Sequence, residues 1–179
     1  MRLASLVAMT AVAVLLPGRA DAQTGSGFGA ELLEDLAGIE QKYVALAEAL
    51  PAGAYTWRPA DGVRSVSEVF MHVVGANYLF PQFFGTPAPS TAPPRDAEKS
   101  WTDKQQVVSA MKESFAHLRG AIERVQDDAL AQTVKLFGQD VTTRKALMVT
   151  FTHLHEHLGQ SIAYARTNKV TPPWSGGVE

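Results

Sequence analysis

Apolar residues recur at spacings of three and four along most of the chain, which is the period of an amphipathic helix. The pattern predicts four helices, over residues 30–50, 66–84, 103–125 and 143–167. Two of the predicted starts carry a capping box, in which a Ser or Thr side chain and a Glu or Gln three residues later satisfy free backbone amides. These are Ser65 with Glu68 and Thr102 with Gln105, while Thr142 is the predicted N-cap of the last helix.

Two long connections separate these helices. Residues 85–100 contain prolines 87, 89, 93 and 94, which predict a crossover loop within one domain. Residues 127–141 are predicted to be irregular or weakly extended, with Val134, Leu136 and Phe137 buried. No segment carries a strong strand signal. We therefore expect an all-α fold, a four-helix bundle with one long crossover loop.

The N-terminus has the features of a secretory signal. Arg2 precedes an apolar run from Leu3 to Leu16, and Ala20-Asp21-Ala22 supplies the small residues that a signal peptidase recognises. The run is shorter than the ~20 residues that span a bilayer. We predict a cleaved signal peptide over residues 1–22, a flexible leader over 23–28 and the bundle over 29–179. The protein is then exported, to the periplasm or the medium, without stable membrane insertion; the alternative is an uncleaved N-terminal anchor.

Charge and composition narrow the partners. Without residues 1–22, 14 Lys and Arg stand against 17 Asp and Glu, a net charge of −3, and no basic run stands out. This argues against nucleic acid and anionic membranes as partners. The chain has no cysteine, which excludes a catalytic thiol and thiolate ligands, so any metal must be held by nitrogen and oxygen. A small-molecule substrate or ligand is the expected partner, and a homodimer remains open.

Helical phase divides the five histidines into two groups. His72 falls on the apolar stripe of the second predicted helix, so it points to the core. His153 and His157 are four residues apart, about 40° around the axis, and share an inward face. His155 lies on the opposite side, and His117 lies beside an apolar stripe, so both are predicted at the surface. The phase therefore predicts that His72, His153 and His157 converge.

Three buried imidazoles need compensation for lost water, and one metal ion supplies it for all three. Three protein nitrogens leave coordination positions open, which is typical of a reactive site and not of a structural one. We expect one divalent ion, zinc or nickel first, with manganese or iron also compatible. Two simpler interpretations stay open: His72 as a hydrogen-bonded core histidine without a metal, and His153 with His157 as a pair of histidines on a helix surface.

The motifs also resemble a known family. The stretch Arg58-Pro59-x-x-Gly62-x-Arg64-Ser65-Val66-x-Glu68-Val69-x-x-His72-Val73, together with His153-x-x-x-His157-Leu158-Gly159-Gln160, is similar to the DinB-like (DinB/YfiT) superfamily of metal-dependent enzymes. The resemblance implies a four-helix bundle in which the three histidines are the metal ligands. It further implies close helix packing at Gly159 and a polar group near the site at Gln160. Members with assigned activities are thiol-cofactor-dependent transferases and isomerases. Because such thiols are chiefly cytosolic, export makes a thiol transferase less expected here.

The segment His153-Leu154-His155-Glu156-His157 also matches the inverted zinc-peptidase motif H-x-x-E-H, in which Glu156 would be the general base. This interpretation ignores His72 and leaves only Glu179 downstream as a carboxylate ligand, so it ranks third. A metal-dependent enzyme of hydrolase or transferase type ranks first, and a non-catalytic bundle that binds a metal or small ligand ranks second. Glu156 and Gln160 are weak catalytic candidates. The weak candidates for substrate binding are Trp57, Tyr164 and Arg166.

Overall fold

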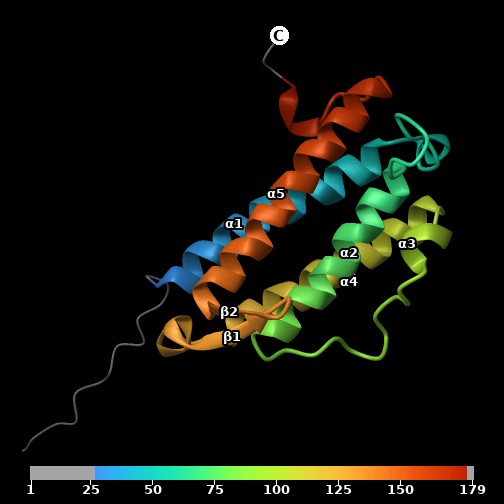
Figure 1. The fold of residues 1–179 in the computed structure, drawn as a ribbon. Coiled ribbons are helices and arrows are strands. Elements are labelled where there is room, and N and C mark those ends of the chain that lie inside the picture. Colours follow the sequence, from blue (N-terminus) through green and yellow to red (C-terminus); the bar gives the residue numbers. More distant parts are fainter. Residues whose placement is uncertain (1–26, 177–179) are drawn as a thin grey trace, which may run out of the picture.

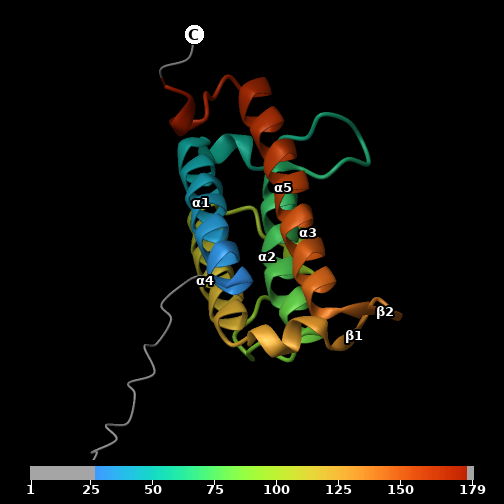
Figure 2. The same ribbon diagram turned by 90° about the vertical axis from the view of Figure 1, so that its left-hand side faces the viewer.

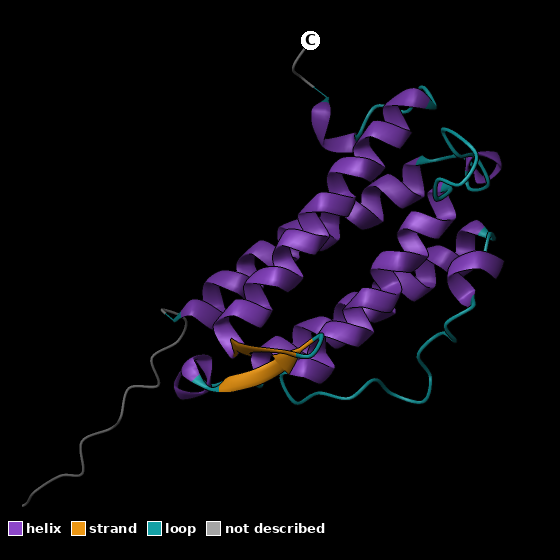
Figure 3. Cartoon of the chain, in the orientation of Figure 1, coloured by secondary structure: helices purple, strands orange, loops and turns teal. Residues whose placement is uncertain are grey.

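Four long helices make up more than half of residues 27–176: α1 (Phe28–Ala49), α2 (Val66–Phe83), α4 (Lys104–Glu123) and α5 (Thr143–Thr167) (Figures 1 and 3). The computed structural model describes residues 27–176, so the predicted signal peptide and most of the predicted leader lie outside the described residues. The four predicted helices therefore all form, each within a few residues of its predicted bounds. A mainly helical chain is confirmed.

The long helices lie side by side, and each contacts two others. α2 packs on α4 and α5, and α1 packs on the same two helices (Figures 1 and 2). The fully buried Tyr43 of α1 shows how the core joins them: its ring lies 5.6 Å from that of Phe115 on α4, and its hydroxyl donates a 2.7 Å hydrogen bond to the carbonyl of Leu154 on α5. Burial of such apolar faces is the main stabilising term of the fold.

The helix starts agree with the sequence at two of three places. Both halves of the predicted box at the start of α2 are present: Ser65 Oγ accepts from the Glu68 amide, and Glu68 Oε2 accepts from the Ser65 amide at 2.8 Å. Thr142 caps α5 as predicted. The prediction for Thr102 is wrong, because Asp103 is the N-cap of α4 and accepts from the Gln106 amide at 2.9 Å. A carboxylate caps as well as a hydroxyl does and also interacts favourably with the helix dipole.

The connection from α2 to α4 is the predicted crossover, but it is not loop throughout. It contains one short helix, α3 (Ala97–Ser100), which packs against α2 (Figure 1). Ala97 is buried there and anchors the turn. Three single-turn 3-10 helices complete the helical elements: η1 (Ala52–Ala54), η2 (Asp127–Ala131) and η3 (Pro173–Ser175).

The segment before α5 is a regular hairpin, so the chain is not purely α-helical (Figure 3). Strands β1 (Thr133–Leu136) and β2 (Gln139–Thr142) pair antiparallel, with Thr133 opposite Thr142. The turn residues Phe137 and Gly138 both have positive φ, 49° and 83°, as in the tight turns that match strand twist.

The hairpin corrects one burial prediction. Leu136 is buried and Val134 half-buried, but Phe137 is 63% exposed. Phe137 occupies the first turn position, which carries its side chain away from the helical core; its ring instead meets the rings of Phe80 and Phe83 at 6.0 and 5.0 Å. Asn or Asp usually fills this position, and their absence hid the turn from the sequence pattern.

None of the helices within residues 27–176 is both long enough and apolar enough to cross a membrane.

Candidate metal centre

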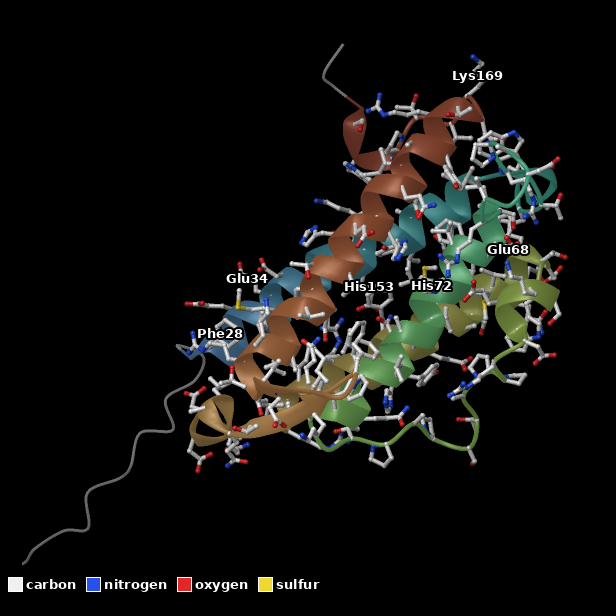
Figure 4. The ribbon with its side chains drawn as sticks, viewed as in Figure 1. Phe28, Glu34, Glu68, His72, His153 and Lys169 are labelled. Atoms are coloured by element: carbon white, nitrogen blue, oxygen red, sulfur yellow. The ribbon has the colours of Figure 1, made fainter. Side chains whose placement is uncertain are left out.

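The three histidines predicted to converge do so, between α2 and α5. His72 comes from α2, and His153 and His157 come from successive turns of α5; Figure 4 shows His72 and His153 in the space between the two helices. One ring nitrogen from each lies within 4.8 Å of the other two, and the Nε2 atoms of His72 and His153 are 3.1 Å apart. Two imidazole nitrogens bound to one tetrahedral zinc lie roughly 3.3 Å apart, since each Zn–N bond is about 2.0–2.1 Å. The spacing therefore fits a shared ion.

His72 is held from behind by a carboxylate. Its Nδ1 lies 3.2 Å from Glu98 Oε2, and Glu98 Oε1 accepts a 2.8 Å hydrogen bond from Arg64 Nε. Arg64 Nη2 also lies 3.2 Å from the same Nδ1, so this nitrogen either accepts from Arg64 or donates to Glu98, depending on the tautomer. In the tautomer that donates Nδ1–H to Glu98, the Nε2 lone pair of His72 is directed toward the other histidines. Carboxylate–histidine pairs of this kind fix the ring and raise its basicity as a ligand.

Sequence analysis missed Glu98. It lies on α3, within the proline-rich crossover, where no helical period marks an inward face. Burial alone would raise the pKa of Glu98, but the hydrogen bonds from Arg64 and His72 outweigh burial and hold its pKa below the ordinary value. Glu98 is therefore a carboxylate at neutral pH, the form that can accept both hydrogen bonds.

His157 is held by a chain of hydrogen bonds along its own helix. Its Nδ1 donates to Gln160 Oε1 at 2.9 Å, and Gln160 Nε2 donates to the Tyr164 hydroxyl at 3.0 Å. The Tyr164 hydroxyl in turn donates to the Arg64 carbonyl at 3.2 Å. With Nδ1 protonated, the Nε2 lone pair of His157 is free for a ligand. Gln160 is thus near the site, as the motif implied, but it acts on the far nitrogen of a candidate ligand.

The environment favours the neutral form of two of the rings, His153 and His72, and the neutral form is the one that binds metal. Burial lowers the pKa of His153 to about 4, helped by the neighbouring His157 and His72. Burial also lowers the pKa of His72, and nearby Arg64 lowers it further against the opposing effect of Glu98. The Nδ1 of His153 is buried with no hydrogen-bond partner among residues 27–176, and its ring packs edge-on against Phe80. Three imidazoles with converging nitrogens are a donor set suited to a borderline divalent ion.

A cavity of about 810 Å³ adjoins the cluster, and His72 and His153 form part of its wall. Glu156 also lines it and is solvent-exposed. No hydrogen bond within the described chain joins Glu156 to a candidate ligand; Glu98 and Gln160 make the contacts to the ligand rings.

The candidates for substrate binding lie elsewhere. Tyr164 is buried in the hydrogen-bond chain described above, and Trp57 packs edge-on against it with ring centroids 5.3 Å apart. Arg166 is exposed in the last turn of α5, and none of the three lines the cavity. Gly159 is exposed, and a Cβ added there would meet nothing within 4 Å, so the expectation of close helix packing is wrong.

The remaining histidines differ from each other. His155 is exposed, as predicted. The prediction for His117 is wrong, because its ring is half-buried against Tyr78, with centroids 5.0 Å apart, and its Nε2 is buried without a partner in the described chain. Both residues lie outside the three-histidine cluster.

Comparison with known proteins decides the family. The model of the DinB superfamily matches residues 36–161, more than two thirds of the chain and including all three histidines. The chain belongs to the DinB superfamily. No curated protein matches this DinB-superfamily chain.

Solved structures agree on the fold. A DinB-like protein from Bacillus cereus is similar with a TM-score of 0.70 and 17% identity, covering 79% of this chain and 93% of that one. A DinB-like protein from Bacillus subtilis has a TM-score of 0.65 and 19% identity, covering 79% and 94%, and a conserved protein from Enterococcus faecalis has 0.65 and 14%, covering 79% and 97%. At these identities the likeness concerns the DinB fold alone.

Proposed function

We propose that this DinB-superfamily protein is a four-helix bundle that holds one divalent metal ion through His72, His153 and His157. We further propose that it acts as a metal-dependent enzyme, of hydrolase or transferase type, on a small molecule. The observation that carries the proposal is the cluster itself: three ring nitrogens within 4.8 Å, two of the rings held by hydrogen bonds on their far side, beside a cavity.

Zinc and nickel fit this donor set best, and iron also accepts imidazole ligands, whereas manganese ranks behind them because it prefers oxygen ligands. A bound ion of this kind supplies Lewis acidity, and three protein ligands are one fewer than a structural zinc site uses. The chain's own residues orient the rings: Glu98 holds His72, and Gln160 holds His157. The open cavity beside His72 and His153 favours a reactive site over a sealed storage site.

Glu156 is the candidate proton acceptor, because it lines the cavity and is not engaged by another described residue. Glu98 also lines the cavity, but Arg64 and His72 already use its two oxygens. The inverted-peptidase interpretation needs a carboxylate as third ligand, and His72 occupies that place in the cluster. We therefore favour a small-molecule enzyme over a peptidase.

Export to the periplasm or the medium belongs to the same proposal. Its support is the sequence pattern of residues 1–22, which lie outside the described residues. Fractionation of the source cells, with N-terminal sequencing of the mature protein, tests it: a chain beginning at Gln23 is expected, and an intact Met1 in the cytoplasm would contradict it.

Elemental analysis of the purified protein tests the metal site. We expect about one equivalent of metal in the wild type and its loss in His72→Ala and His157→Ala, with retention in the control His155→Ala, whose ring is exposed. A wild type without stoichiometric metal, or retention by both ligand variants, contradicts the site. Turnover of a panel of small esters and amides tests catalysis: if the metal-loaded wild type is no faster than His72→Ala, the non-catalytic binding role replaces the enzyme.

A further inference from the structure

The cavity beside the three histidines extends along α2 and is mainly apolar. Its walls come from α2, the crossover, the tip of the β hairpin and α5, and its apolar members include Val74, Leu79, Phe80, Phe137 and Val149. At about 810 Å³ it falls in the range of roughly 300–1,000 Å³ typical of pockets for small molecules. Its apolar surface is far larger than the metal cluster requires.

Two small residues keep the α2 side of the cavity wide. Gly75 and Ala76 follow His72 by one helical turn, and both line the cavity. Gly75 lies in the helix interior, where glycine is less stable than alanine, and its backbone does not have the positive φ that would require glycine. Gly75 is exposed at the mouth of the cavity, and a Cβ placed there would meet nothing within 4 Å. The absence of a side chain at Gly75 therefore leaves space beside the candidate metal site that a larger residue would fill.

The side chains around the cavity carry little net charge of their own. Arg95 is the one Lys or Arg among the lining residues, and two carboxylates, Glu98 and Glu156, line the same cavity. Glu98 forms a salt bridge with Arg64, which does not line the cavity. The negative charge of Glu156 then balances the positive charge of Arg95. A phosphate or carboxylate body would need a cluster of cations or amide donors.

From these observations we infer the substrate class: a small molecule with an uncharged, apolar body, which occupies the space over Gly75 and Ala76, and one Lewis-basic head group, neutral or anionic, directed at His72 and His153. The position of the apolar body follows from the cavity alone. The role of the head group rests on the proposed metal site.

The cavity is tested with N-phenyl-1-naphthylamine, an uncharged fluorescent probe, and 1-anilinonaphthalene-8-sulfonate, which has the same rings and a negative charge. We expect the uncharged probe to bind the wild type roughly 10-fold more tightly than the sulfonate, and Gly75→Leu to weaken it by roughly 10-fold because the new side chain displaces the probe. Gly38→Leu is the matched control, since Gly38 is exposed in the interior of α1 and also has nothing within 4 Å of an added Cβ. Equal binding by all three proteins, no binding at all, or preference for the sulfonate overturns the inference.

The head group is tested on the zinc-loaded protein with two hydroxamic acids that differ only in chain length, acetohydroxamic and octanohydroxamic acid. The longer acid has six more methylenes, and each buried methylene favours binding by about fourfold, so burial of half of them gives roughly 60-fold. We therefore expect the longer acid to bind at least roughly 30-fold more tightly, and this advantage to shrink in Gly75→Leu. Equal affinities would show that the apolar cavity does not serve the metal site and would overturn the inference. If the protein takes up no zinc, the proposed function fails, and the fluorescent probes still decide the cavity on their own.

Discussion

Replacing Glu98 by glutamine keeps the shape of the side chain and removes its charge, and we expect this change to weaken metal binding without unfolding the protein. In the wild type the carboxylate accepts from Arg64 Nε at 2.8 Å and lies 3.2 Å from His72 Nδ1. A glutamine can present one oxygen only, and its amide group would face a second N–H donor. One of the two hydrogen bonds is therefore lost, and His72 is less firmly oriented.

The expected loss of affinity is about 10- to 100-fold, which corresponds to roughly 1.4–2.8 kcal/mol, the usual effect of removing a partner of a ligating histidine. Folding should change little, because the Arg64 side chain is 38% exposed and that of Glu98 25% exposed, and such pairs contribute about 0–1 kcal/mol. Proton competition is not the cause at pH 7.5. The pKa of His72 already lies below its ordinary value, so the ring is neutral with or without Glu98.

Competition for zinc against a chromophoric chelator at pH 7.5 measures the effect, with thermal unfolding as a check that each variant is folded. Glu34→Gln is the control, since Glu34 is exposed on α1 away from the site (Figure 4). We expect the control to match the wild type. A Glu98→Gln protein that binds zinc as tightly as the wild type would refute the idea that Glu98 supports His72.

Three further variants test other contacts. Gln160→Leu should lower zinc affinity by about 10- to 100-fold in the same competition assay, because His157 loses its acceptor, and unchanged affinity would contradict this. Glu68→Gln should cost about 1 kcal/mol in urea unfolding at pH 7. Burial raises the pKa of Glu68, but its hydrogen bonds and the nearby cations outweigh burial and hold the pKa below the ordinary value of 4.5. The difference in unfolding free energy between Glu68→Gln and the wild type should therefore be present above pH 4.5 and vanish as the pH falls through the folded-state pKa. A difference that persisted in acid would contradict this explanation. Tyr43→Phe should cost about 1 kcal/mol in unfolding, since it removes the buried bond to Leu154, and a neutral effect would count against that bond.

The helices could be predicted because their signals are local. The three-and-four period places α1, α2, α4 and α5 within a few residues, and the box of Ser65 and Glu68 marks the start of α2. The hairpin could not be read in the same way, because Phe137 occupies a turn position that Asn or Asp usually fills. Helix α3 is one turn long and packs against α2 with Ala97 buried, which no local pattern encodes.

The candidate ligands could be predicted for the same reason. His153 and His157 share a face of one helix, and His72 lies on the apolar stripe of another, so helical phase alone separates them from His155. His117 was misplaced because it lies at the edge of a stripe, where phase does not distinguish a surface ring from one stacked on Tyr78. The size of the cavity, and the role of Gly75 in it, depend on elements that are distant in sequence.

The rings of His157 and His72 are oriented by different kinds of contact. Gln160 holds His157 from one turn further along α5, so that contact forms whenever α5 is helical. Glu98 reaches His72 from the crossover, 26 residues away, so that contact requires α3 to be docked on α2. The crossover also forms part of the cavity wall through Ala88, Ala92 and Pro93. The segment that supports His72 is therefore the one that encloses the apolar space beside it, and a change in the docking of the crossover alters the orientation of a ligand and the shape of the cavity together.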